Sequence, residues 1–227
     1  MEIGIIGAGD MGRLYARKLA GSYPVNVCDL PNKRAAVEKE LAGTGVNVLS
    51  DGIEVSRISD IVIYSVEAGR IRKAVRAYGP STKKGAIVAG QTSVKTPEIE
   101  AFEAFLPDDV DIVSCHSLHG PTVDPAGHTL ALIRHGSSEN AYRTFREAME
   151  KLGSNIVEIP DYHEHDRITA DTQAATHMGF ESMGSAWKSA GFYPWENASY
   201  AGGIDNVKAL MMLRIFGGRR TSTPAWP

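Results

Sequence analysis

Three glycines near the N-terminus constrain the fold more than any other feature of the sequence. The segment MEIGIIGAGDMGRLYARKLAG reads as a short apolar strand, a tight turn and a helix, and it places Gly7, Gly9 and Gly12 in G-x-G-x-x-G spacing. The first glycine permits the turn, the second leaves room for a pyrophosphate, and the third allows close helix–strand packing. A second strand, VNVCD, ends in Asp29, where a carboxylate reaches an adenosine ribose. Together these features predict a dinucleotide-binding fold.

Apolar strands and helices then alternate along the chain. The sequence predicts strands at DIVIYSV (60–66), GAIVAG (85–90) and VDIVSC, a helix over 68–78 and another that opens at TPEIEAFEAF. Strands that are apolar on both faces and joined by helices are typical of parallel sheets covered on both sides. We therefore expect an α/β fold with a doubly wound, Rossmann-type, mainly parallel sheet.

The C-terminal part of the sequence has a different character. After TLALIRH and the amphipathic segment ENAYRTFREAMEKLG, no strand pattern follows, and Ile168, Ala175, Ser182 and Ala186 recur at helical spacing. This pattern predicts a long helix from about Glu164 that begins an incomplete all-helical domain. We divide the chain into a dinucleotide-binding domain (1–160), the start of a helical substrate and dimerisation domain (161–216) and an atypical tail (217–227).

Composition excludes several classes of partner. A formal net charge of -3 argues against nucleic acid, and no apolar run approaches the length of a membrane span. Cys28 and Cys115 each end an apolar run, which favours reduced thiols in strands over a disulfide or a metal pair, and no metal is expected. No leader precedes the strand that begins at Ile3, so we expect a cytoplasmic protein.

The carboxyl ends of the predicted strands meet at one edge of the sheet, where ligands bind in such folds. The segments SVEAG, GQTSVK and CHSLHGP all follow strands, so they should open onto one crevice. His116 and His119 lie at its mouth. We expect the cofactor to contact the glycine turn, the end of the second strand and the end of the strand at 60–66, which together supply Gly7, Gly9, Asp10, Met11, Gly12, Asp29, Lys33, Arg34, Ser65 and Val66.

Several segments resemble the fungal type of NADP-dependent prephenate dehydrogenase, in the same order along almost the whole chain. They are GIIGAGDMGRLYA, IVIYSVEA, GQTSVKTPEIEAFE, SCHSLHGPTV, EHDRITADTQAATHMGFESMGSAW and YPW. The resemblance implies oxidative decarboxylation of prephenate to 4-hydroxyphenylpyruvate in tyrosine biosynthesis, and a homodimer for the full-length form.

The resemblance also implies roles for individual residues. His116 matches the catalytic histidine, for which an imidazole with a pKa close to the working pH is well suited. Ser93 matches the serine that orients the substrate hydroxyl and the histidine, although it is also placed to cap the following helix. His119 is the rival base, and it otherwise contacts the ligand or fills the turn. We interpret EHD, Glu164 to Asp166, mainly as helix-start chemistry.

The two carboxylates of prephenate need cationic or hydrogen-bonding partners. Arg214 matches the substrate-binding arginine of the family, and His177 matches a histidine that approaches the substrate from the helical domain. Gln173 lies four residues before His177, so the two share a helix face. A lone histidine at such a position is otherwise a packed core residue.

The choice of cofactor contains a conflict. An acidic residue at the end of the second strand favours NAD, whereas the resemblance implies NADP. Lys33 or Arg34, in LPNKR, can turn back to a 2′-phosphate, and we therefore predict NADP over NAD.

Two other readings remain. A β-hydroxyacid dehydrogenase or imine reductase shares the N-terminal pattern, although such enzymes need a catalytic lysine where this chain has His177. A truncated relic that binds nucleotide without turnover is the second. Members of the family continue through further helices after the arginine, whereas here Gly217, Gly218, Pro224 and Pro227 oppose a helix. We expect a C-terminally truncated chain whose tail arises from a frameshift or misplaced exon junction near 217–220, and exposed apolar positions near Met178.

Overall fold

The computed structural model describes residues 1–191, 207–211 and 213. Its contacts divide the chain into two compact units, Met1–Asp166 and Arg167–Pro227, and each is described by itself. Among the described helices, none has both the length and the apolar character that crossing a membrane requires.

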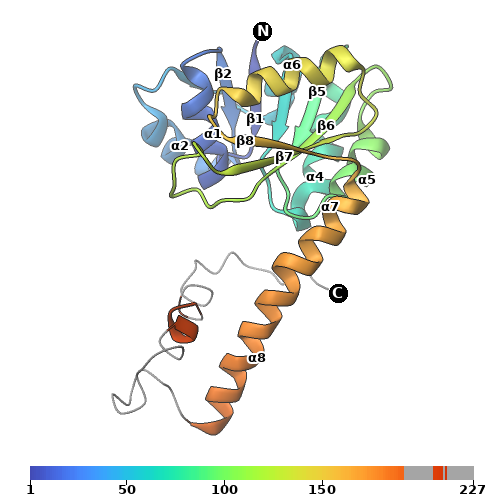
Figure 1. Cartoon of the computed structure of the whole chain (residues 1–227). Coiled ribbons are helices and arrows are strands. Elements are labelled where there is room, and N and C mark those ends of the chain that lie inside the picture. Colours follow the sequence, from blue (N-terminus) through green and yellow to red (C-terminus); the bar gives the residue numbers. More distant parts are fainter. Residues whose placement is uncertain (192–206, 212, 214–227) are drawn as a thin grey trace. The chain divides into compact units, whose positions relative to one another are not determined.

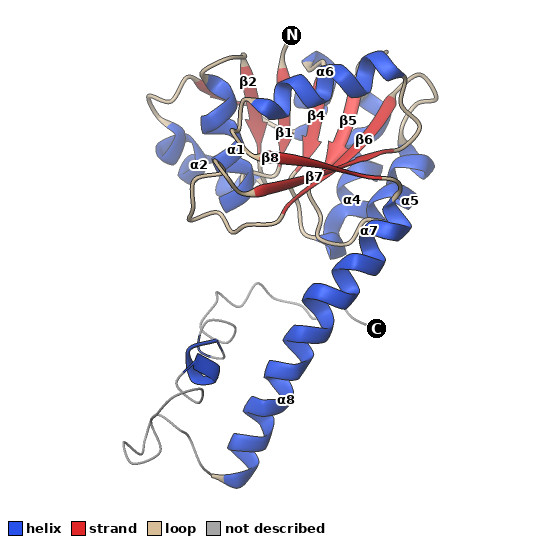
Figure 2. Cartoon of the chain, viewed as in Figure 1, coloured by secondary structure: helices blue, strands red, loops and turns tan. Residues whose placement is uncertain are grey.

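The first unit is built on an eight-stranded sheet with the order β3-β2-β1-β4-β5-β6-β7-β8. Strands β1 to β6 run parallel to their neighbours, β7 is antiparallel to β6, and β8 is parallel to β7 (Figure 2). The strands are β1 (Ile3–Ile6), β2 (Val25–Cys28), β3 (Val46–Val48), β4 (Ile61–Tyr64), β5 (Ile87–Gly90), β6 (Asp111–Ser117), β7 (Thr129–Arg134) and β8 (Asn155–Ile159).

Helices connect the strands and cover both faces of this sheet (Figure 1). They are α1 (Asp10–Ala20), α2 (Arg34–Leu41), α3 (Gly52–Ile58), α4 (Ala68–Tyr78), α5 (Thr96–Phe105) and α6 (Glu139–Glu150), with short 3-10 turns at Pro31–Lys33 and Gly79–Ser81. Side chains of α1, α2 and α6 pack in one core layer, and those of α3, α4 and α5 pack in the other.

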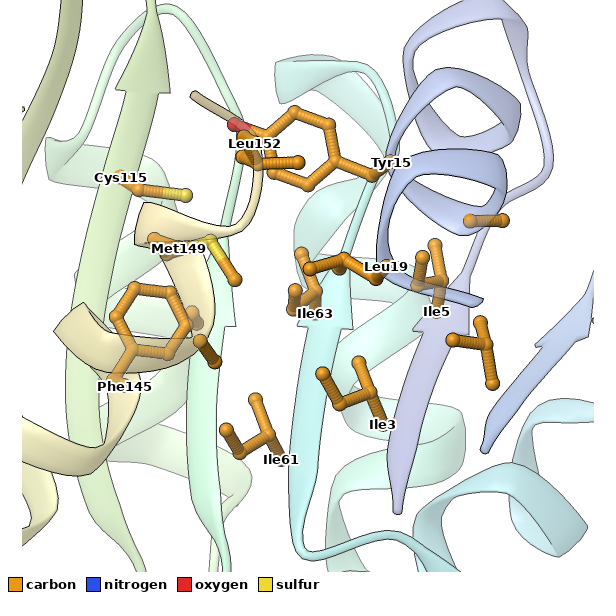
Figure 3. Packing of buried hydrophobic residues seen from close by; sticks show 14 of the residues in the cluster. Ile3, Ile5, Tyr15, Leu19, Ile61, Ile63, Cys115, Phe145, Met149 and Leu152 are labelled. Carbon is orange, nitrogen blue, oxygen red and sulfur yellow. The ribbon is translucent and has the colours of Figure 1, made fainter. Parts of the chain in front are cut away.

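The two core layers follow from alternation along each strand. In β4, Ile61 and Ile63 face the layer that contains α1 and α6, whereas Val62 and Tyr64 face the opposite layer. Figure 3 shows Tyr15 and Leu19 of α1 and Phe145 and Met149 of α6 gathered around Ile61 and Ile63. Each such side chain contributes about 1.5–3 kcal/mol when it is fully buried, so both faces hold the sheet rigid beneath its carboxyl edge.

The predicted doubly wound, mainly parallel sheet is confirmed, and three short elements were not predicted. β3, α3 and β8 are short, and β3 and β8 are not fully buried, so their apolar pattern is weak. The inner face of α1 also differs from the expected one. It buries Tyr15, whose hydroxyl lies 2.7 Å from the Ser117 hydroxyl of β6, whereas Leu14 is half-buried.

The predicted long helix is present. α7 (Tyr162–Thr169) begins two residues earlier than expected, a π-helical segment (Ala170–Ala174) follows, and α8 (Ala175–Ala190) ends at Gly191, whose φ of 61° caps the helix in the left-handed region. Met178 is 66% exposed. Residues 217–227, on which the tail prediction rests, lie outside the described residues.

Candidate cofactor cavity and histidine cluster

The glycine turn between β1 and α1 has the geometry that the G-x-G-x-x-G spacing predicts. Gly7 has a φ of 101°, and a Cβ placed on it would lie 2.3 Å from the Ser65 carbonyl oxygen. A Cβ on Gly12 would lie 2.1 Å from the Gly7 oxygen, whereas a Cβ on Gly9 would meet nothing within 4 Å. Gly7 and Gly12 therefore serve packing, and the open face at Gly9 leaves room for a phosphate to approach the start of α1.

A cavity of about 380 Å³ opens at this turn. Its wall comes from the carboxyl ends of β1, β2 and β4 and from one face of α4. Six of the predicted cofactor residues line it, namely Gly7, Gly9, Asp29, Lys33, Ser65 and Val66. The glycine geometry and this lining fit a dinucleotide.

The other predicted cofactor residues are placed differently. Gly12 packs under Gly7, and Asp10 and Met11 form the first turn of α1, where backbone N–H groups lack helical acceptors. Arg34 does not line the cavity, because its guanidinium Nε pairs with the Glu38 carboxylate at 2.8 Å along α2. The structure therefore does not bring Arg34 to this site.

Asp29 braces the glycine turn. One carboxylate oxygen accepts a hydrogen bond from the Ala8 backbone N–H at 3.0 Å, and the other accepts from the Leu30 N–H at 2.7 Å. The Asp29 side chain is only 9% exposed, and the Lys33 ammonium lies 4.0 Å from it. Asp29 is thus held by the protein itself, in addition to lining the cavity.

The second site is a chain of hydrogen bonds at the carboxyl end of β6. His116 Nδ1 lies 3.0 Å from His165 Nε2, and His165 Nδ1 lies 2.9 Å from Asp166 Oδ1. Because the Asp166 carboxylate can only accept, His165 donates to it through Nδ1. In the neutral pair, His165 Nε2 then accepts from His116 Nδ1–H, which leaves the lone pair of His116 on Nε2.

Asp166 has a second task that ties this cluster to α5. Its two oxygens accept hydrogen bonds from the backbone N–H groups of Lys95 and Thr96 and from the Thr96 hydroxyl, at 2.7–2.8 Å. This carboxylate from α7 therefore caps α5. The capping alternative for Ser93 is wrong, because the N-cap of α5 is Lys95 and the capping carboxylate comes from Asp166.

A fully buried ion pair lies beside the histidine cluster. The Lys95 ammonium donates to the Cys115 carbonyl oxygen at 2.6 Å and to Glu98 Oε1 at 3.1 Å, and both side chains are 0% exposed. Glu98 also accepts from the hydroxyls of Ser114 and Thr92. A Cβ on Gly90 would lie 2.1 Å from the Glu98 carboxyl carbon, so the glycine that ends β5 makes room for this carboxylate.

The surroundings of His116 set its protonation state. Burial and the neighbouring Lys95 ammonium lower the pKa of His116 to about 3. For Asp166, hydrogen bonds from His165, Lys95 and Thr96 outweigh the effect of burial and hold the pKa of the carboxyl well below its usual range. The expectation of a pKa near the working pH is therefore wrong for His116, which is neutral in its resting state.

The remaining predicted residues of the first unit lie apart from this hydrogen-bond chain. Ser93 is exposed in the turn between β5 and α5. His119 is half-buried, its Nδ1 donates to the Gly120 carbonyl oxygen at 2.9 Å, and its Nε2 is buried without a partner among the described residues. His116 is thus the histidine that the strand positions.

Three predicted substrate residues belong to the second unit. His177 Nδ1 lies 2.6 Å from the Gln173 carbonyl oxygen, so it donates to that oxygen, which leaves its Nε2 with the lone pair. Arg214 lies outside the described residues.

Sequence analysis missed His165, Asp166, Lys95 and Glu98 as parts of one cluster, and it missed the wall of the cavity formed by α4. The signal for that wall was available in the helical spacing of Arg70, Lys73, Ala74, Ala77 and Tyr78, all of which line the cavity. No comparable periodicity marks the histidine cluster.

Comparisons with known proteins agree with the resemblance seen in the motifs. The chain is 49% identical over 219 residues to a probable prephenate dehydrogenase [NADP(+)] of Schizosaccharomyces pombe, covering 96% of this chain and 51% of that protein. It is 47% identical to prephenate dehydrogenase [NADP(+)] of Saccharomyces cerevisiae, with 96% and 49% covered. The predicted resemblance is confirmed, and the chain spans about half the length of these curated relatives.

Solved structures share the fold at low sequence identity. Prephenate dehydrogenase from Aquifex aeolicus superposes with a TM-score of 0.74 at 18% identity, covering 94% of this chain and 82% of that one. A 3-hydroxyisobutyrate dehydrogenase from Mycobacterium tuberculosis gives 0.65 at 17% identity, covering 85% and 66%. These likenesses concern the fold alone.

Two family models match consecutive parts of the sequence. Residues 174–221 match a 6-phosphogluconate dehydrogenase C-terminal domain. Residues 2–160, well over half of the chain, match the NAD binding domain of 6-phosphogluconate dehydrogenase. The glycine turn, the sheet order and this match agree, and the chain belongs to the family of that NAD binding domain.

Proposed function

We propose that this chain carries the cofactor site and the catalytic base of an NADP-dependent prephenate dehydrogenase, which converts prephenate to 4-hydroxyphenylpyruvate in tyrosine biosynthesis. The observation that carries the proposal is the hydrogen-bond chain from His116 through His165 to Asp166 at the carboxyl edge of the sheet. Similarity to two fungal enzymes whose names include this activity supports it.

His116 suits the proton transfer that this reaction needs. As hydride leaves the carbinol carbon of prephenate, the hydroxyl proton passes to His116 Nε2, the bond to the ring carboxylate breaks, carbon dioxide leaves and the ring becomes aromatic. The nicotinamide of NADP, when bound, accepts the hydride. A positioned base of this kind contributes about 10²–10⁴ in rate.

His165 and Asp166 compensate for the low basicity of His116. When His116 gains a proton at Nε2, its Nδ1–H strengthens the hydrogen bond to His165, and Asp166 lies 2.9 Å from the far nitrogen of that ring. The negative charge of Asp166 thus stabilises positive charge anywhere along the two rings. The same contacts fix the tautomer and the orientation of His116.

Other residues complete the proposal. Ser93 orients the substrate hydroxyl, His119 contacts the ligand from the turn after β6, and Gln173, His177 and Arg214 bind the substrate from the second unit. Gly7, Gly9, Asp10, Met11, Gly12, Asp29, Lys33, Ser65 and Val66 hold NADP. The homodimer and the cytoplasmic location stay predictions, as do the domain limits at 160 and 216.

The test is absorbance at the reduced-nicotinamide band after prephenate is added with NADP and, separately, with NAD. We expect turnover with NADP, and His116→Asn should lower it by about 100-fold or more while leaving the dissociation constant for NADP unchanged. The matched variant His119→Asn should lose much less.

Each contrary outcome has a distinct meaning. Undiminished turnover by His116→Asn would remove His116 as the base. Turnover of a 3-hydroxy acid or an imine in place of prephenate would favour the rival dehydrogenase reading, and NADP binding without any turnover would favour the relic.

A further inference from the structure

The cavity at the glycine turn contains a cation that the protein does not neutralise. Three basic residues line it, Lys33 from the turn before α2 and Arg70 and Lys73 from α4. The Lys33 ammonium lies 4.0 Å from the Asp29 carboxylate, and Arg70 Nε lies 3.2 Å from the Glu67 carboxylate. Lys73 forms no ion pair with any residue that the structure describes. The cavity therefore has an excess of one positive charge, located at Lys73.

The two carboxylates of the cavity are already engaged. Asp29 accepts from two backbone N–H groups and is 9% exposed, so its charge serves the glycine turn as well as any ligand. Glu67 pairs with Arg70 one helical turn away. An acidic residue at the end of β2 would repel a phosphate on the ribose 2′ position, but here that charge is partly satisfied by the backbone and faced by Lys33.

Lys73 stands on the face of α4 that forms the cavity wall. The residues of this stripe, Arg70, Lys73, Ala74, Ala77 and Tyr78, recur at helical spacing. Ala74 and Ala77 are small, and Leu30 lines the cavity from the segment after β2. These side chains provide an apolar slot for a base, and the ammonium of Lys73 lies on the wall of that slot.

We propose that Lys73, with Lys33 facing it across the cavity, binds the 2′-phosphate of the adenosine ribose and thereby selects NADP over NAD. This assignment rests on the proposed use of NADP and names the residue that recognises it. The 2′-phosphate carries about -1.5 to -2 charges at pH 7, so it gains most from a cation that has no other partner. Lys73 replaces Arg34 as the second basic residue of the phosphate site.

The test uses fragments of the two cofactors and needs no substrate. Isothermal titration calorimetry measures binding of 2′,5′-ADP, which has the extra phosphate, and of 5′-AMP, which lacks it. We expect the parent chain to prefer 2′,5′-ADP. Lys73→Ala should weaken 2′,5′-ADP by about 10-fold or more, as expected for a charge-assisted contact, and leave 5′-AMP within about two-fold.

Arg76→Ala is the matched control, because Arg76 is an exposed basic residue of α4 that does not line the cavity. It should leave both ligands unchanged. Equal losses for 2′,5′-ADP and 5′-AMP in Lys73→Ala would overturn the proposal, since Lys73 would then contact the base, and so would no loss at all or a parent chain without preference. A failure of the prephenate assay would leave these binding results untouched.

Discussion

The cofactor cavity and the histidine cluster lie at the same edge of one sheet, yet they are built from different materials. The cavity depends on backbone shape, with two glycines that no other residue can replace and charges that remain exposed. The cluster depends on side chains that are almost entirely buried, since His165 is 2% exposed and Lys95 and Glu98 are 0% exposed. A backbone site tolerates changes in its charged rim, whereas a buried network fails when one member is lost.

The first prediction sharpens this contrast through the largest effect. Lys95→Met leaves the Glu98 carboxylate buried without its cation, and removal of one partner of a buried pair costs about 3–5 kcal/mol. Chemical denaturation should show that loss in the free energy of unfolding. The exposed pair of Arg34 and Glu38 is the control, because Glu38→Ala should cost less than about 1 kcal/mol.

A double variant separates the charge from the packing. Lys95→Met combined with Glu98→Gln removes both charges, so part of the lost stability should return. If the single variant is as stable as the parent chain, the buried pair is not what holds β5, β6 and α5 together.

The second prediction concerns pH and the histidine cluster. The pKa of His116 is about 3 in the folded chain and 6.5 in the unfolded chain, so both states are neutral at this position above pH 6.5. Below that pH the unfolded state binds a proton that the folded state refuses. Stability should fall by about 2 kcal/mol between pH 6.5 and 4.5 from this residue alone.

His116→Asn is the control, since it should flatten the slope of unfolding free energy over that range. Below about pH 4, stability should fall in both proteins, because the pKa of Asp166 is held low by its hydrogen bonds and protonation removes that contribution. An unchanged slope in His116→Asn would show that another group refuses the proton.

The two regions also differ in how far the sequence predicts them. Gly7, Gly9 and Gly12 act through local geometry, so their spacing is visible within six residues of text and the fold follows from the apolar strands behind it. Lys95, His116 and Asp166 meet only because β5, β6 and α7 converge, and no periodicity relates them. EHD was therefore interpreted as helix-start chemistry, whereas its aspartate caps a different helix, α5.

The last prediction tests the backbone character of the cavity with the smallest change in stability. Gly9 is the N-cap of α1, it has extended backbone angles and no side-chain cap, and a Cβ there meets nothing within 4 Å. Gly9→Ser should therefore fold normally and change the unfolding free energy by only a few tenths of a kcal/mol, because serine is a good N-cap. Its hydroxyl would occupy the space and the N–H groups that a pyrophosphate needs, so the dissociation constant for NADP should rise by about 10-fold or more. Gly21→Ser, at the other end of α1, is the matched control and should leave NADP binding unchanged. If Gly9→Ser binds NADP like the parent chain, the pyrophosphate does not lie at this turn, and the contrast between a backbone site and a side-chain site would no longer hold.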